Sequence, residues 1–243
     1  MFWSRRTAPA QFPGRDVLDA MSEDFPLLAR GRDADVFDRG DGTVLRRYRD
    51  HDVPAHEVRA MRHARSQGYP VPDIVAVSGR DLILNRITGP TMQEVLLSER
   101  GSLSDKAAQL AELHHRLHQI AGPVWLRSRG DGDRLLHLDL HPKNVILSPS
   151  GPVVIDWANV ARGPAALDPA LAIAIFVTAK ANAGPEERSA IDAFVDAFAS
   201  HFAGADLDAA LPLALDLRRG DPNVTDVERA ELAAFARTRR SSK

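Results

Sequence analysis

The chain has 243 residues, of which 44% are hydrophobic and 26% charged, and its formal net charge is -2. These values are typical of a globular protein with a large core, and the missing basic excess argues against a nucleic-acid partner. There is no cysteine, which excludes disulfides, thiolate metal sites and cysteine nucleophiles. The longest apolar run, residues 170–177, is far shorter than the ~20 residues of a membrane-spanning helix. We therefore expect a cytoplasmic protein with no membrane partner.

The N-terminal part of the chain predicts a small antiparallel sheet. Residues 1–22 show little periodicity, and no apolar stretch follows the paired arginines as an export signal requires, so we expect a peripheral segment. Alternating apolar residues between turn-forming residues then predict strands. The predicted strands are residues 26–30, 35–38 and 43–48, followed after a helix by residues 73–77 and 82–87. The helix is expected over residues 55–67, because Gly68 and Pro70 end it.

The remainder of the chain predicts a mainly helical region. A helix capped by Ser102 or Ser104 has apolar residues at three- and four-residue intervals up to Ile120. It carries His114 and His118 one turn apart; a metal pair is conceivable, but no third ligand is evident nearby and a solvated or structural cluster is the better interpretation. A further helix includes residues 170–177. Two more are expected to complete the chain, one after Gly184-Pro185 and one after the capping box that begins at Thr225.

Between these helices, two polar loops flank a predicted hairpin. Residues 137–144 read HLDLHPKN, and residues 154–160 read VIDWANV. The apolar runs between the loops, with turn residues 148–152 joining them, predict that both loops emerge at one end of the hairpin. Phosphoryl transfer needs such a convergence, because Mg²⁺ must bridge the phosphates and a base must orient the acceptor hydroxyl. Asn144 and Asp156 suit the metal, and Asp139 suits the base.

In this spacing the chain resembles the aminoglycoside phosphotransferase and choline kinase-like family, whose catalytic loop reads H-x-D-x-H-P-x-N and whose metal Asp follows in I-D-W or I-D-F. The resemblance implies an α+β, two-lobed protein kinase-like fold. We expect a peripheral segment at 1–22, a nucleotide-binding lobe with a small antiparallel sheet at 23–87, and a larger, mainly helical catalytic and acceptor-binding lobe at 88–243. It also implies that His137 braces the catalytic loop and that Asp168 supports this loop from below.

The resemblance further implies a nucleotide site in the N-terminal lobe. Gly31 would lie in the loop over the phosphates, although a single glycine there is by itself more typical of an ordinary hairpin. Arg46 takes the place of the usual strand lysine, with Glu57 as its partner; Arg46 could instead be a solvated edge charge, and Glu57 could simply favour the helix dipole. Asn85 and Ile87 would border the hinge, whose backbone pairs with the nucleotide base.

The sequence thus predicts an enzyme, a Mg²⁺-dependent small-molecule kinase that transfers the terminal phosphoryl group of ATP or GTP to a hydroxyl of a small acceptor. The alternative is a non-catalytic nucleotide- or partner-binding protein with the same fold, a possibility motivated by the missing strand lysine. The short segment after Asp156 argues against a loop-regulated protein kinase. Several acids near the C-terminus could attract a cationic acceptor such as an aminoglycoside, or could be solvated helix faces. They are Asp206, Asp208, Asp216 and Asp221. The acceptor and the oligomeric state are not readable from the sequence.

Overall fold

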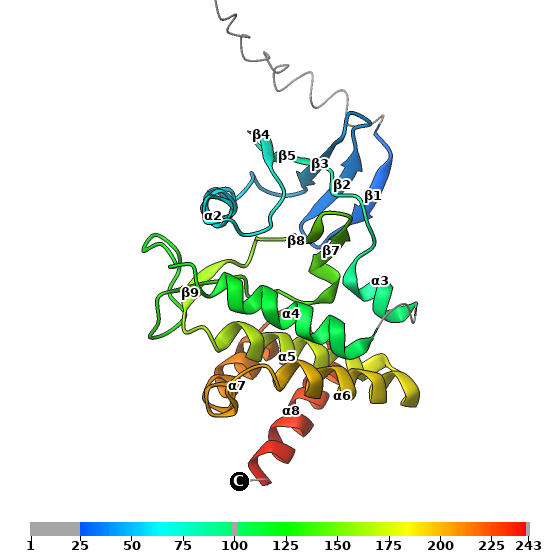
Figure 1. Ribbon diagram of the computed structural model, residues 1–243, viewed down its shortest axis with the longest axis vertical. Helices are drawn as coiled ribbons and strands as arrows, with labels where there is room; N and C mark the ends of the chain where they lie inside the picture. The colour runs from blue at the N-terminus through cyan, green and yellow to red at the C-terminus, as the bar shows by residue number, and fades with distance from the viewer. Residues whose placement is uncertain (1–24, 99–101, 242–243) are drawn as a thin grey trace, which may run out of the picture. The chain divides into compact units, whose positions relative to one another are not determined.

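The computed structural model describes residues 25–98 and 102–241 and divides the chain into two compact units (Figure 1). The first combines Met1–Val53 with Asp73–Arg86, and the second combines Pro54–Pro72 with Ile87–Lys243. The predicted peripheral segment, 1–22, lies outside the described residues. The α+β class is confirmed, with an antiparallel sheet toward the N-terminus and a helical C-terminal region.

The first unit is a five-stranded antiparallel sheet in the order β1-β2-β3-β5-β4. Its strands are β1 (Leu27–Arg30), β2 (Ala34–Asp38), β3 (Thr43–Tyr48), β4 (Ile74–Ser78) and β5 (Asp81–Asn85). Gly40 and Gly42 have φ angles of 74° and 82°, which glycine adopts readily, so the turn between β2 and β3 forms without strain. The five predicted strands are present, although β5 ends at Asn85 and not at Ile87.

The second unit contains most of the helices and two small sheets. The helices are α2 (Ala55–Ser66), α3 (Met92–Leu97), α4 (Leu103–Leu117), α5 (Leu167–Ala179), α6 (Pro185–Ala199), α7 (Gly204–Arg219) and α8 (Asp226–Ser241), with 3-10 turns η2 (Pro142–Asn144) and η3 (Lys180–Asn182). In the sheets, β6 (Arg134–Leu136) pairs with β9 (Ala161–Gly163), and β7 (Val145–Ser148) pairs with β8 (Gly151–Val154). Helix α5 packs against α6, α7 and α8 and is apolar on nearly all sides, so it forms the centre of the core.

The prediction of two helices after α5 was wrong, because α6, α7 and α8 are all present. Helix α7 contains Pro212, which lacks an N–H and normally disfavours a helix interior. It forms nonetheless because Leu207, Leu211 and Leu215, at four-residue spacing, are buried against the rest of the unit. None of the helices within residues 25–98 and 102–241 is long and apolar enough to cross a membrane.

Candidate active site

The β7–β8 hairpin brings the two predicted polar loops together. Its register pairs Val145 with Val154, and the Ile155 N–H continues the ladder by donating to the Asn144 carbonyl at 3.0 Å. Asn144 and Asp156 therefore leave the hairpin at the same end, as the turn residues of the sequence predict. Asp156 has a φ of 65°, a left-handed conformation that costs a non-glycine residue free energy.

Asp168, at the start of α5, holds the backbone of the catalytic loop. Its two carboxylate oxygens accept the N–H groups of His137 at 2.9 Å and Leu138 at 2.6 Å. Leu138 has a φ of 60°, which is a rare conformation for a bulky side chain, so these two hydrogen bonds stabilise a strained backbone. This contact is the one expected for a residue that supports the loop.

The environment of Asp168 keeps its carboxylate ionised. Burial alone would raise its pKa, but the hydrogen bond from His118 and the nearby imidazoles of His114 and His137 lower it to about 2. His118 Nε2 lies 3.2 Å from Asp168 Oδ2. Burial lowers the pKa of His114 to about 3, so this ring is neutral at physiological pH. A buried carboxylate with three donors is thus a fixed anchor for the loop.

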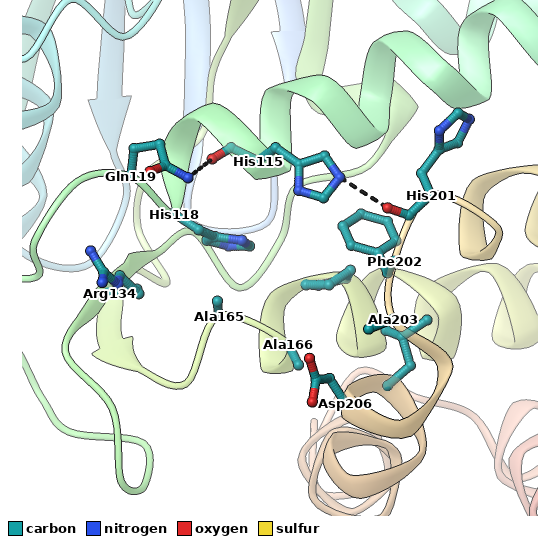
Figure 2. Close-up of a pocket in the computed structure, with 12 residues that line it drawn as sticks. His115, His118, Gln119, Arg134, Ala165, Ala166, His201, Phe202, Ala203 and Asp206 are labelled. Atoms are coloured by element: carbon teal, nitrogen blue, oxygen red, sulfur yellow. Dashed lines mark hydrogen bonds between the residues drawn. The ribbon is translucent and has the colours of Figure 1, made fainter.

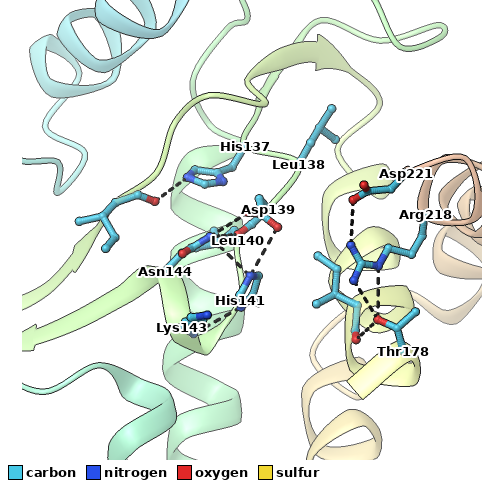
Figure 3. Close-up of polar contacts among 12 residues, drawn as sticks. His137, Leu138, Asp139, Leu140, His141, Lys143, Asn144, Thr178, Arg218 and Asp221 are labelled. Carbon is cyan, nitrogen blue, oxygen red and sulfur yellow. Dashed lines mark hydrogen bonds and ion pairs between the residues drawn. The ribbon is translucent and has the colours of Figure 1, made fainter. Parts of the chain in front are cut away.

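The carboxylate of Asp139 is held in one orientation by two neighbours in the loop (Figure 3). The Asn144 carboxamide nitrogen donates to the Asp139 carbonyl at 2.9 Å and to Oδ2 at 3.0 Å, and His141 Nε2 lies 3.4 Å from Oδ1. His141 Nδ1 accepts the Lys143 N–H, so Nε2 carries the proton that points at Asp139. Burial would raise the pKa of Asp139, but the hydrogen bonds from His141 and Asn144, together with the nearby His141 and His137 rings, hold the pKa below the usual value.

His137 is fully buried and does not belong to the set that converges on Asp139. Its Nε2 contacts the Ile155 carbonyl at 3.1 Å, and its ring packs edge to face on Trp157 with 4.9 Å between centroids. Burial lowers the pKa of His137, so the ring is neutral and Nε2 donates to that carbonyl. The contact ties the catalytic loop to the end of β8, which fits a bracing role.

The chemistry of Asn144 and Asp156 fits a magnesium ion. Because the Asn144 carboxamide nitrogen donates to Asp139, its oxygen is the atom left for a metal. The half-buried Asp156 supplies a carboxylate at the same end of the hairpin. Mg²⁺ prefers one or two such oxygen ligands and completes its shell with water and phosphate oxygens. These two residues would hold the ion.

In the first unit, Gly31 is required by a tight turn. Its N–H donates to the Ala34 carbonyl at 2.9 Å, and a Cβ at this position would lie 2.8 Å from that same oxygen. Arg49 fastens the loop by donating to the Gly31 carbonyl at 2.7 Å. Because the Gly31 N–H already donates to the Ala34 carbonyl, a phosphate bound at this loop would accept hydrogen bonds from other groups of the loop.

The two arginines of β3 lie in different environments. Arg47 forms a bidentate pair with Asp81, at 2.7 and 2.6 Å, within the sheet. Arg46 points to the opposite face, with its guanidinium carbon 5.1 Å from the centroid of the Tyr48 ring, and is half-buried. The two arginines thus lie on opposite faces of β3, and the phosphate role of Arg46 remains a prediction.

The other predicted nucleotide-site residues are placed as follows. Glu57, in the first turn of α2, is fully buried within the second unit. Asn85 is exposed and its carboxamide donates to Asp73 at 3.3 Å, while Ile87 is half-buried. Their roles at a nucleotide remain predictions.

His114 and His118 have a third potential ligand beside them that was not evident from the sequence. Asp168 supplies one, and a ligand atom from each of these three buried residues lies within 4.8 Å of the others. Asp168 is separated from His118 by 50 positions, so sequence spacing gave no signal. Because Asp168 already accepts the two loop N–H groups, the cluster is explained as the support of the catalytic loop.

Comparison with known proteins agrees with this geometry. A sequence model of the phosphotransferase enzyme family matches residues 96–213. A search of curated proteins gives no match. The matched segment, just under half of the chain, holds the catalytic loop, the hairpin and Asp168. This confirms the predicted resemblance and the enzyme class, a phosphotransferase with an alcohol group as acceptor, or small-molecule kinase.

Solved structures show the same fold. An aminoglycoside phosphotransferase from Alicyclobacillus acidocaldarius has a TM-score of 0.55 at 14% identity, with 97% of each chain covered. A choline/ethanolamine kinase family protein from Mesorhizobium loti has a TM-score of 0.54 at 18% identity, covering 92% of this chain and 90% of that one. A ternary complex of streptomycin, ATP and APH(2'')-IIa has a TM-score of 0.55 at 13% identity, covering 85% and 88%. The protein kinase-like fold is confirmed.

Proposed function

We propose that this protein is a Mg²⁺-dependent small-molecule kinase that transfers the terminal phosphoryl group of ATP, or of GTP, to a hydroxyl of a small acceptor. One observation carries the proposal. Asn144 donates through its carboxamide to Asp139 while its backbone carbonyl fixes the strand that leads to Asp156. A base and two metal ligands are thereby joined in a single hydrogen-bonded unit at one end of a hairpin.

In this mechanism Asp139 orients the acceptor hydroxyl and takes its proton as the oxygen forms a bond to the phosphorus. The bond from phosphorus to the bridging oxygen breaks, and the nucleoside diphosphate leaves with that oxygen. The low pKa of Asp139 makes its carboxylate a weak base, so its larger contribution is to position the hydroxyl. The proton transfer would come late, when the hydroxyl has become more acidic.

The remaining residues would bind and align the nucleotide. Asn144 and Asp156 would hold Mg²⁺, which would neutralise charge on the phosphates. Arg46, paired with Glu57, supplies the phosphate cation in place of a lysine, and its planar group can offer two donors. The Gly31 loop covers the phosphates, and the backbone around Asn85 and Ile87 meets the base.

The solved relatives support the nucleotide and the kind of acceptor. The complex of APH(2'')-IIa contains both ATP and streptomycin, so this fold holds a nucleotide and a hydroxylated acceptor together. We extend the two-substrate arrangement to this chain, but not the identity of the acceptor, since one fold serves many substrates. A cytoplasmic location and the lack of nucleic-acid and membrane partners remain predictions.

Calorimetric titration tests the metal and nucleotide site. ATP and GTP are titrated with and without Mg²⁺ into the native protein, into Asp156→Ala, and into Asp192→Ala. The last removes an exposed acid on α6 that pairs with Lys180 and serves as a charge-matched control. We expect Mg²⁺-dependent binding that Asp156→Ala abolishes and Asp192→Ala leaves intact. A folded native protein that binds neither nucleotide would refute the proposal.

Turnover separates the enzyme from the alternative. Hydroxylated acceptors are screened by the release of ADP or GDP, and the active ones are tested with Asp139→Ala. We expect this variant to lose turnover while its nucleotide affinity stays within about two-fold of native, because Asp139 is not proposed to hold the metal. Tight nucleotide binding with neither transfer nor hydrolysis under any condition would instead favour a non-catalytic nucleotide-binding protein.

A further inference from the structure

A cavity of about 390 Å³ lies within the second unit, and the residues that line it do not include those of the catalytic hairpin (Figure 2). It is bounded by the C-terminal end of α4, the start of α5 and the start of α7. Ala165, Ala166 and Ala203 leave the space open because their side chains are small. The volume is within the range of about 300–1,000 Å³ typical of small-molecule sites.

The polar groups of the cavity are mostly hydrogen-bond acceptors. His118 is buried and its Nε2–H donates to the ionised Asp168, so in the neutral form of this ring Nδ1 carries a lone pair. His115 donates from Nε2 to the His201 carbonyl, and Nδ1 of its neutral ring is likewise an acceptor. Within residues 25–98 and 102–241, neither Nδ1 has a hydrogen-bond partner, and the Asp206 carboxylate has neither a hydrogen bond nor an ion pair. A ligand that fits these atoms must donate hydrogen bonds.

The charged side chains of the cavity favour a cation at its Asp206 side. Asp206 and Arg134 lie on opposite sides of Ala165 in Figure 2, and Arg134 pairs with Asp133 at 3.3 Å. The positive charge of Arg134 is therefore partly neutralised by Asp133. At the α7 side, Phe202 also lines the cavity, and its ring packs against His115 with 4.8 Å between centroids.

We propose that this cavity binds a small organic ammonium ion, whose N–H groups donate to the Asp206 carboxylate and to His118 Nδ1. The site is separate from the acceptor site at Asp139, because the contact from His118 to Asp168, both buried, stands between the cavity and the backbone of the catalytic loop. Of the four acids that the sequence offered for a cation, Asp206 lines this cavity, while Asp216 and Asp221 pair with arginines.

Occupancy of the cavity bears on catalysis, a consequence that rests on the proposed function. An N–H donated to His118 Nδ1 withdraws electron density from the ring and strengthens the hydrogen bond from Nε2–H to Asp168, since hydrogen bonds in a chain polarise one another. Asp168 in turn holds His137 and Leu138 through their N–H groups. A bound ammonium ion thus stabilises the catalytic loop from behind.

The test compares n-butylammonium with 1-butanol, a neutral molecule of nearly the same shape, in titrations of the full chain followed by ¹H–¹⁵N NMR. We expect n-butylammonium to shift the amide signals of Ala165, Ala166 and Phe202 in a saturable way, and 1-butanol to bind at least about ten-fold more weakly, because it lacks the charge that Asp206 attracts. Asp206→Asn should weaken n-butylammonium binding by about ten-fold or more.

Two control variants keep the test decisive. Asp208→Asn removes an acid on the same helix that does not line the cavity, and it should leave n-butylammonium binding unchanged. Asp139→Ala should do the same. Equal binding of both probes, no binding, or unchanged binding by Asp206→Asn would overturn the proposal, as would shifts that centre on the catalytic loop and vanish in Asp139→Ala. Ammonium binding in a protein that fails to bind nucleotide would remove the proposed kinase function and leave this site standing.

Discussion

Replacing Asp168 by asparagine tests how the catalytic loop is supported. The carboxylate accepts three N–H groups, from His137, Leu138 and His118, and the residue is 1% exposed. A carboxamide has one oxygen and an NH₂ group, so at least one buried donor would face another donor. Hydrogen bonds to charged groups contribute about 1.5–3 kcal/mol each, so Asp168→Asn should lower the free energy of unfolding by about 3 kcal/mol.

The pH dependence gives this prediction a second, independent readout. The pKa of Asp168 falls from an ordinary 3.8 to about 2 in the folded protein, which corresponds to about 2 kcal/mol of stability at neutral pH. Because the folded pKa is the lower one, this stability is present above pH 4 and is lost as the pH falls toward 2. About half of it should be gone at pH 3, and Asp168→Asn should lack this dependence.

Urea unfolding measured by tryptophan fluorescence provides the assay, since Trp125 and Trp157 both belong to the second unit. Asp192→Asn is the matched control: its ion pair with Lys180 spans 2.6 Å but its side chain is 58% exposed, so the loss should stay below about 1 kcal/mol. The reasoning is refuted if Asp168→Asn unfolds within about 0.5 kcal/mol of the native protein, or if the difference between them is the same at pH 7 and pH 3.

Three further predictions concern the site and the sheet. His141→Asn removes the donor to one oxygen of Asp139, so it should lower kcat about ten-fold without changing nucleotide affinity. Steady-state kinetics measures kcat and calorimetry measures the affinity. An unchanged kcat would contradict the prediction. Asp156→Gly should relieve the strain of the left-handed backbone, so its unfolding free energy should exceed that of Asp156→Ala by about 0.5–1 kcal/mol. It should also abolish Mg²⁺-dependent nucleotide binding. Equal urea midpoints for the two variants would count against backbone strain at this position. Arg47→Met should destabilise the first unit by about 2–4 kcal/mol, because it removes the arginine that pairs with the buried Asp81 carboxylate. Adding Asp81→Asn to this variant should restore part of the lost stability. Hydrogen exchange of the β3 amides measures both effects, and no recovery in the double variant would argue against the pair.

The hairpin of the candidate site was predictable from local sequence. Its two apolar runs and the turn residues between them fix the register, and Asn144 and Asp156 then follow at one end. Helix α3 also has a local signal in the sequence, because Thr91 and Glu94, three residues apart, form a capping box. Helix α7 was harder to predict, because Pro212 lies inside it and disfavours a helix, and the helix is stabilised by burial of its leucine face.

Other features of the site depend on contacts that the sequence does not encode locally. His118 and Asp168 are 50 residues apart and meet only when α4 and α5 are in place. The role of His141 was missed, although its position two residues after Asp139 offered a clue, because its effect depends on which ring nitrogen carries the proton. The pairing of Arg46 with Glu57 remains a prediction, because the sequence pattern identifies these two side chains as candidates but does not show that they meet.

The hydrogen bonds from the Leu138 and His137 N–H groups to Asp168 also bear on how the chain folds. The strained loop precedes its anchor by 30 and 31 residues, so during synthesis the loop leaves the ribosome before the helix that holds it. Until α5 packs into the core, nothing offsets the unfavourable backbone of Leu138, and the loop should sample ordinary conformations. The catalytic arrangement is therefore a late product of folding, acquired together with the core of the second unit and not before it.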